Sequence, residues 1–185
     1  MNKVLQRWGE LAVCLTALHG STTAHATEAA HVHGLMHLDI AVEQKLLTLQ
    51  LEAPLDSLLG FERRPRTPAE RQAADALLKQ MGDASVLFKP DAAAQCVLAT
   101  VSVESAALQS SPSASAKQAG QEGGHADLDA SYEFNCARPD QLTAIDIGLF
   151  DAFKRLQKIE VQVAGAKGQS RQTLQRPDKR VKLAR

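Results

Sequence analysis

Three of the six histidines in this chain, His31, His33 and His37, fall close together near the start. Residues two and four apart in a β-strand point to the same side. A strand over residues 30–43 would therefore place all three imidazoles on one face, together with Asp39. The alternate positions are all apolar: Met36, Leu38, Ile40 and Val42. The stretch predicts a strand with one face toward a core and one face of side chains that bind metal ions.

A second group of such side chains occurs at His125 and Asp127, in a segment, 125–136, that alternates in the same way. Zinc takes about four ligands in proteins, from histidine nitrogen, cysteine sulfur or carboxylate oxygen. If the two strands lie near one another, their side chains complete a tetrahedral set. The predicted zinc ligands are His31, His33, His125 and Asp127. His37 and Asp39 are alternative ligands, or hydrogen-bond partners that fix the tautomer of a ligating imidazole.

The first 26 residues have the three parts of a secretory signal peptide. A positively charged start and the apolar run 11–18 are followed by Ala24-His25-Ala26, an A-x-A cleavage site. The alternative of a retained membrane anchor conflicts with the length of the run, since a spanning helix needs about 20 residues. We therefore expect residues 1–26 to be removed on export to the periplasm, leaving a single domain over residues 27–185.

Cleavage after Ala26 removes Cys14 and leaves Cys96 and Cys136 as a pair. In an oxidising compartment two cysteines most simply form one disulfide, and the alternative is two buried free thiols. A crosslink that closes a loop of this length stabilises the fold by roughly 4 kcal/mol in the loop-entropy model. Because these thiols are expected to be oxidised, the zinc site is expected to use histidine and carboxylate ligands.

Charge excludes two classes of partner. The chain has 21 basic and 21 acidic residues and a formal net charge of 0. This balance gives no electrostatic reason to expect binding to nucleic acid, or to a membrane surface once the signal peptide is removed. The locally basic end, 167–185, is interpreted as a solvated terminal hairpin.

Short alternating segments joined by turns make up most of the remaining chain. Strands are expected over 30–43, 45–52, 86–88, 95–104, 125–136, 142–147, 159–164, 169–175 and 179–183. One helix is expected from Thr67-Pro68-Ala69-Glu70, a capping box with proline at the first helical position, to about Met81. A second, short helix is expected over 148–157. Strands that follow one another in this way predict an α+β domain of mainly antiparallel β-sheet with two helices.

The segment at about 105–124 is dominated by alanine, serine, glutamine and glycine. Such a composition cannot bury enough apolar surface to order the chain, so a flexible loop between two strands is expected.

In the order of its short motifs, the chain resembles a family of bacterial periplasmic proteins described as zinc-regulated, the ZrgA type. The matching landmarks run from about residue 30 to the C-terminus and include AHVHG, Gly60-Phe61-Glu62, Ala94-Gln95-Cys96, the segment from His125 to Cys136, and Leu149-Phe150-x-x-Phe153. The resemblance implies a zinc-binding periplasmic protein with a role in zinc transport and homeostasis. The partners that it implies are the zinc ion and a periplasmic solute-binding protein or an ABC-type zinc importer.

The chain departs from this family pattern at two places. Members typically carry a histidine- and acid-rich insertion between the two cysteine strands, whereas residues 105–124 contain no histidine. A histidine is also expected after Gly60-Phe61-Glu62, and this chain has Arg63 there. The first departure argues against binding of several ions, and the second removes one expected ligand.

Two other functions remain open from the residues alone. A histidine-rich zinc site with an open position can activate water, which would make the protein a zinc hydrolase. The sequence contains no HExxH helix, nucleophile elbow or phosphate loop, and we expect a protein that is not an enzyme. The other alternative is a periplasmic interaction module with no metal role, in which the polar strand faces are solvated surface and the strand edges bind a partner.

Overall fold

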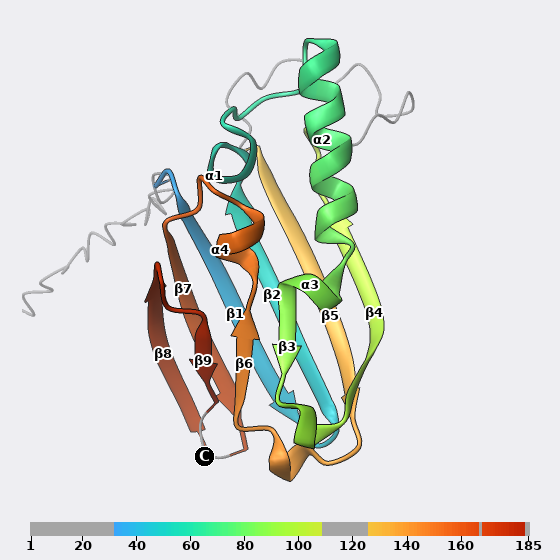
Figure 1. The fold of residues 1–185 in the computed structure, drawn as a ribbon, viewed down its shortest axis with the longest axis vertical. Helices are drawn as coiled ribbons and strands as arrows, with labels where there is room; N and C mark the ends of the chain where they lie inside the picture. The colour runs from blue at the N-terminus through green and yellow to red at the C-terminus, as the bar shows by residue number, and fades with distance from the viewer. Residues whose placement is uncertain (1–31, 109–125, 167, 184–185) are drawn as a thin grey trace, which may run out of the picture. The chain divides into compact units, whose positions relative to one another are not determined.

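A six-stranded sheet forms the centre of the protein in the computed structural model, which describes residues 32–108, 126–166 and 168–183 (Figure 1). The order of the strands across the sheet is β4-β5-β2-β1-β7-β8. Their bounds are β1 Leu35–Glu43, β2 Leu46–Pro54, β4 Cys96–Glu104, β5 Asp127–Cys136, β7 Lys158–Gly165 and β8 Gly168–Gln175.

Strands β1 and β2 form a hairpin, which turns at Gln44 and Lys45. The pairing of β1 with β7 is parallel, whereas the other neighbouring strands of this sheet are antiparallel. The sheet is therefore mixed, and the expectation of a mainly antiparallel sheet holds for all pairs but one. Strands β1 and β7 are far apart in the chain, so neither a turn nor a local pattern could indicate their pairing.

One face of the sheet is covered by helices and by a small second sheet, which lie in front of it in Figure 1. The helices are α1 Leu55–Leu59, α2 Pro68–Met81, α3 Ala84–Leu87 and α4 Leu149–Ala152. The small sheet has the order β3-β6-β9, with bounds β3 Phe88–Pro90, β6 Ala144–Ile147 and β9 Arg180–Lys182. The expectation of two helices was wrong: the described residues form four α-helices, because α1 and α3 are short turns that carry no helical periodicity. The second expected helix, 148–157, ends early, at Ala152.

Helix α2 begins where its sequence predicts. The hydroxyl oxygen of Thr67 accepts a hydrogen bond from the Glu70 backbone N–H, and the Glu70 carboxylate accepts one from the Thr67 backbone N–H. This capping box satisfies donors that have no partner within the helix. The helix buries Ala74, Leu77 and Met81 against the sheet side of the protein.

The hydrophobic core fills the space between the large sheet and its covering layer. Leu38, Leu49 and Tyr132 come from three adjacent strands and are fully buried. The ring of Tyr132 packs against Phe88 with centroids 4.8 Å apart, and its hydroxyl donates a hydrogen bond to the Met81 carbonyl oxygen at 2.8 Å. Burial of apolar surface at about 25 cal/mol per Å² makes this interior the main source of stability.

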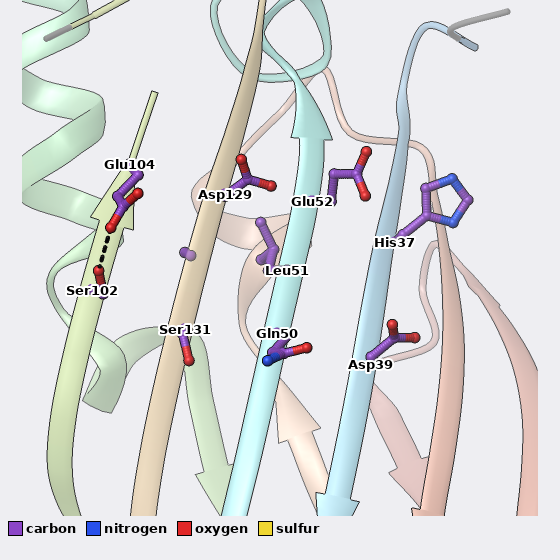
Figure 2. A pocket seen from close by; sticks show the side chains of 10 residues that line it. His37, Asp39, Gln50, Leu51, Glu52, Ser102, Glu104, Asp129 and Ser131 are labelled. Carbon is purple, nitrogen blue, oxygen red and sulfur yellow. Dashed lines mark hydrogen bonds between the residues drawn. The ribbon is translucent and has the colours of Figure 1, made fainter. Parts of the chain in front are cut away.

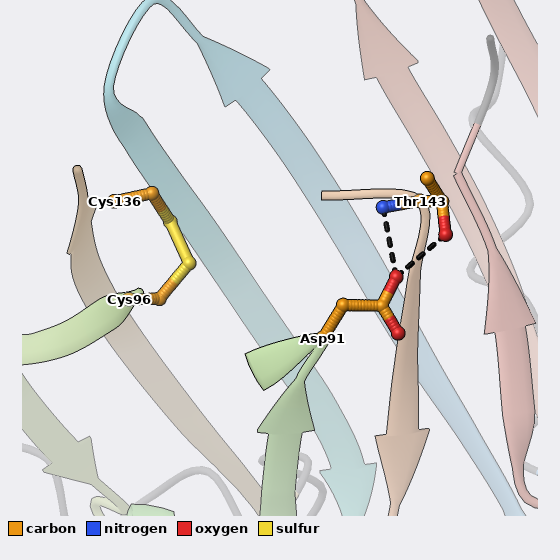
Figure 3. The surroundings of a disulfide bond; sticks show 4 residues. All are labelled: Asp91, Cys96, Cys136 and Thr143. Carbon is orange, nitrogen blue, oxygen red and sulfur yellow. Dashed lines mark hydrogen bonds between the residues drawn. A yellow bond between two sulfur atoms is a disulfide. The ribbon is translucent and has the colours of Figure 1, made fainter. Parts of the chain in front are cut away.

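A disulfide and a group of hydrogen bonds connect neighbouring elements at the end of the sheet where β4 starts, and Figure 3 shows them together. Cys96 and Cys136 are directly opposite one another on β4 and β5 and form the predicted disulfide. The Asp91 carboxylate accepts hydrogen bonds from the Thr143 hydroxyl at 2.6 Å and from the backbone N–H groups of Thr143 and Ala144 at 3.0 and 2.8 Å. Together they fasten the edge strand to the sheet and β3 to β6.

Some predictions concern residues outside the described ranges. The signal peptide over residues 1–26 and most of the loop at about 105–124 belong to this group, and both stay predictions. Within the residues that the structure places, no helix is long and apolar enough to cross a membrane.

Candidate metal-binding site

Strand β1 has the two faces that its sequence predicts. Met36, Leu38 and Ile40 are buried in the core, whereas His37 and Asp39 are exposed on the opposite face of the sheet. The predicted alternation is confirmed from Met36 to Ile40, whereas Leu35, where the strand begins, is also buried.

His33 lies in a turn before β1 and not on the strand. Gly34 has a φ of +76°, a left-handed conformation that favours glycine, and the chain turns there. His33 therefore does not continue the exposed face of His37 and Asp39, and the expectation of a shared strand face was wrong for this residue. The reason is local: the prediction began the strand before Gly34, whereas the backbone turns at this glycine and the strand begins only at Leu35.

The turn brings His33 to helix α1. Its Nδ1 lies 2.6 Å from Oδ2 of Asp56, in the first turn of α1, and the Gly34 N–H donates to the Ser57 hydroxyl oxygen at 2.9 Å. A carboxylate oxygen can only accept a hydrogen bond, so the ring proton of His33 is on Nδ1. In the neutral imidazole Nε2 is then the nitrogen that can coordinate a metal ion. The His33 side chain is 69% exposed, which leaves its ring accessible.

Asp56 also receives a cation. The Arg155 Nε–H donates to the Asp56 backbone oxygen at 2.9 Å, and its guanidinium lies 3.5 Å from Oδ1 of the same residue. The carboxylate thus has Oδ2 on the histidine and Oδ1 toward the arginine. Because partners on both sides fix its orientation, Asp56 is suited to orient the His33 ring.

The second predicted group begins at the same end of the sheet. The backbone carbonyl of Ala126 accepts a hydrogen bond from the Leu55 N–H at 2.9 Å, which places the start of β5 beside α1. Asp127 is the first residue of β5, and its backbone carbonyl accepts a hydrogen bond from the Ser105 hydroxyl at 2.7 Å. Strands β1 and β5 flank β2 and both start from the α1 end, about 10 Å apart at two strand spacings.

Two of the predicted ligands, His31 and His125, lie outside the described residues. Of the remaining four, His33 and Asp127 lie at the α1 end, whereas His37 and Asp39 lie on the exposed sheet face. Within the described residues, no three histidine, cysteine or acidic side chains are arranged to hold a metal ion. A complete set of zinc ligands therefore needs residues outside the described ranges, such as His31 and His125.

His37 belongs to a row of polar side chains that crosses the sheet (Figure 2). Directly opposite it are Glu52 on β2 and Glu160 on β7, and the row continues from Glu52 to Asp129 and then to Glu104. His37 Nδ1 lies 3.7 Å from Oε2 of Glu160. Lys158 is hydrogen-bonded to the Glu160 carboxylate and is the main cause of its lowered pKa.

Asp129 is the most crowded carboxylate of this row. Burial raises its pKa, and the neighbouring charges of Glu52 and Glu104 raise it further. Sequence reasoning missed these carboxylates because their strands are not adjacent in the chain. Each does lie on the polar side of a segment that alternates, so the signal was present, but only the strand order brings them together.

Arg63 occupies the position where the resemblance led us to expect a histidine. Its guanidinium donates to both carboxylate oxygens of Glu70, at 2.8 and 2.9 Å, and lies over the Phe61 ring. Glu70 is the capping-box residue of α2, so Arg63 supports the start of that helix.

Sequence comparison gives the family. A model of the ZrgA family of zinc uptake proteins matches residues 30–183. This chain belongs to the ZrgA family. The match spans both predicted groups of zinc ligands and all strands of both sheets. Among curated proteins no match was found.

Proposed function

We propose that this ZrgA-family protein is exported to the periplasm, binds zinc there and assists zinc uptake through a transporter, without acting as an enzyme. The family is one of zinc uptake proteins, which supports a role in zinc transport and homeostasis. In the proposal the partners are the zinc ion and a periplasmic solute-binding protein or ABC-type zinc importer.

The observation that carries the zinc-binding part is the pair of His33 and Asp56. Histidines that bind a metal almost always donate their other ring N–H to a carboxylate, a carbonyl or water, which fixes the tautomer and makes the ligand more basic. His33 has this arrangement, with Nδ1 2.6 Å from the carboxylate. The proposed site is therefore at the α1 end of the sheet.

The proposed ligand set places His33 at the centre of the site. His31 is two residues before it in the chain, and His125 immediately precedes Ala126, whose carbonyl is hydrogen-bonded to the start of α1. Asp127 begins β5 at the same end of the sheet. The proposed ligands are His31, His33, His125 and Asp127, with Asp56 as the residue that orients His33.

Calorimetric titration of the mature protein with zinc tests this site. We expect His33→Ala to lose binding, and Asp56→Asn to weaken it by about 10- to 100-fold because the imidazole loses its orienting partner. The matched control is His37→Ala, which removes a histidine that also lies beside a carboxylate, Glu160, but on the exposed sheet face. This control should bind zinc as the unchanged protein does.

Two outcomes would contradict the proposed site. If His37→Ala lost binding and His33→Ala kept it, the site would have to be rebuilt around His37, Asp39 and Glu160. If saturating zinc left the melting temperature of the unchanged protein where it was, zinc binding itself would fail, since a ligand that binds only the folded state stabilises it.

A further inference from the structure

The face of the large sheet that is not covered by helices carries a concentrated negative charge. We call it the open face and define it by the outward side chains of β4, β5, β2 and β1. These four strands contain no lysine or arginine. The acidic side chains of the open face are Asp39, Glu43, Glu52, Glu104, Asp127, Asp129 and Glu133. All are exposed except Asp127 and Glu133, which are half-buried.

Between these carboxylates the surface is hollowed. Two adjoining hollows share Asp39 and Gln50, and Thr48, Ala41 and Ser131 contribute short side chains to them. In Figure 2 Gln50 and Ser131 lie next along their strands from Glu52 and Asp129, with Asp39 beside Gln50 on β1. Short side chains such as Ala41, Ser131 and Thr48 lose little conformational entropy when they are covered.

Among the residues that the structure describes, no lysine or arginine forms an ion pair with Glu52, Glu104 or Asp129. Glu104, Asp129 and Glu52 lie side by side in register, and like charges directly opposite one another on a sheet destabilise it. A positively charged partner over the row would relieve this repulsion.

The size of the face favours a protein over a single ion. Its four strands of nine or ten residues cover about 14 by 30 Å, an area far larger than the coordination sphere of one ion. A metal ion needs several ligands that converge on one point. In the described ranges no three ligand side chains do so, because the carboxylates are spread over separate strands.

The basic residues of the C-terminal segment have other partners. Arg176 donates to the carbonyl oxygens of Phe153 and Leu156, and Lys179 pairs with Asp151. Arg180 pairs with Asp91 and Asp146 in the covering layer. These side chains are therefore committed to the covered side and do not neutralise the open face.

A second copy of the chain is also a poor occupant. Face to face, two copies would bring the same carboxylates together. The neighbouring strands β7 and β8 offer only Lys158 and Arg171 to balance them, and Lys158 is already paired with Glu160. Like-charge contacts across an interface cost free energy and suppress such pairing.

We propose that the open face docks a partner protein through a surface rich in lysine and arginine. The partner covers the row from Glu104 to His37 and places its cations between neighbouring carboxylates. The row lies near the α1 end of the sheet, two residues from Asp127 along β5 and four from His33 along the chain, so the docked partner sits close to the proposed zinc site. The contact is made through Glu52, Glu104 and Asp129, which are not among the proposed zinc ligands, so docking and zinc binding are tested by different variants.

Site-specific photo-crosslinking tests the docking surface with the full chain in its native cell. A photoreactive phenylalanine derivative is placed at Gln50, in the middle of the open face, and in a control at Gln80, which is exposed on α2. We expect a crosslinked product from Gln50 only. Its partner peptide, identified by mass spectrometry, should come from a segment rich in lysine and arginine.

Charge variants show whether the carboxylates cause the docking. Combining Glu52→Gln, Glu104→Gln and Asp129→Asn should lower the yield of that product by roughly tenfold, from three ion pairs of modest strength. The matched control makes the same change of net charge with Asp75→Asn, Asp140→Asn and Asp178→Asn, all exposed and away from this face, and should keep the yield. Equal melting temperatures show that both proteins are folded.

Three results would overturn the proposal. One is a crosslinked product made of two copies of this chain. Another is a product whose yield is the same in the neutralised variant and in the unchanged protein. The third is the absence of any product from Gln50 that Gln80 does not also give.

Discussion

Asp91 and Asp129 are the same type of side chain in opposite surroundings. Burial alone would raise the pKa of Asp91, but donors from Thr143, Arg180 and Ala144 outweigh it and lower the pKa to about 2. Asp129 lies beside two other carboxylates. Burial raises its pKa, and the negative charges of Glu52 and Glu104 raise it further. The covered side of the protein thus uses its carboxylate to join elements, whereas the open face holds carboxylates that do not stabilise the fold.

This difference separates residues kept for stability from residues available for binding. A carboxylate whose oxygens are filled by the protein's own donors has little left to offer a partner. A carboxylate among other carboxylates gains when a cation arrives. The three predictions that follow test whether the two sides differ in this way.

The largest effect is expected from removing the Asp91 carboxylate. Asp91→Ala leaves the donors of Thr143, Ala144 and Arg180 without their acceptor and should lower the free energy of unfolding by about 3 kcal/mol. Asp129→Ala should change it by less than about 0.5 kcal/mol, or raise it. Urea denaturation at neutral pH measures both, and equal losses in the two variants would remove the contrast.

The second prediction concerns acid. Because the pKa of Asp91 is lower in the folded protein than its ordinary value of 3.8, its contribution is fully present above about pH 4 and is lost as the pH falls toward 2. The contribution is about 2 kcal/mol by linkage. Denaturation curves between pH 5 and pH 2 should therefore fall less steeply for Asp91→Asn than for the unchanged protein. Parallel profiles would show that Asp91 is not held in this way.

The smallest effect is expected on the open face. Burial is the main cause of the raised pKa of Asp129 and stays in place when Glu52 and Glu104 are replaced by glutamine. The two neighbouring charges are removed, however, so the pKa should fall part of the way toward its ordinary value. The fold should gain at most about 0.5 kcal/mol at neutral pH, since these exposed charges are screened by solvent. Titration of the Asp129 carboxyl by NMR measures the shift. A pKa that is unchanged in the double variant would assign it to burial alone.

Local patterns predicted much of the fold. The alternation of apolar and polar residues identified the core face of β1, and the capping box at Thr67 identified the start of α2. The pairing of Cys96 with Cys136 followed from the number of cysteines left after cleavage, and it is confirmed. These features depend on residues that are close in the chain, or on a choice with a single outcome.

Features that depend on distant parts of the chain were not predicted. The parallel pairing of β1 with β7 and the small sheet of β3, β6 and β9 join segments with no turn between them. The same limit applied to the candidate site. His33 was placed on a strand that Gly34 ends, and its partner Asp56 is 23 residues away in a helix that the sequence did not indicate.

The position of β1 sets the order in which the protein can finish folding. Strand β1 is the first strand among the described residues, yet it lies in the interior of the large sheet and takes β7, more than a hundred residues later in the chain, as one of its two neighbours. Until Lys158–Gly165 arrives, the hydrogen-bonding groups on that side of β1 have no strand to pair with, and such an edge invites pairing with other chains. During the proposed export, a chain whose C-terminal part is delayed would therefore be a target for aggregation or for a chaperone, and the sheet is completed only when β7 has joined it.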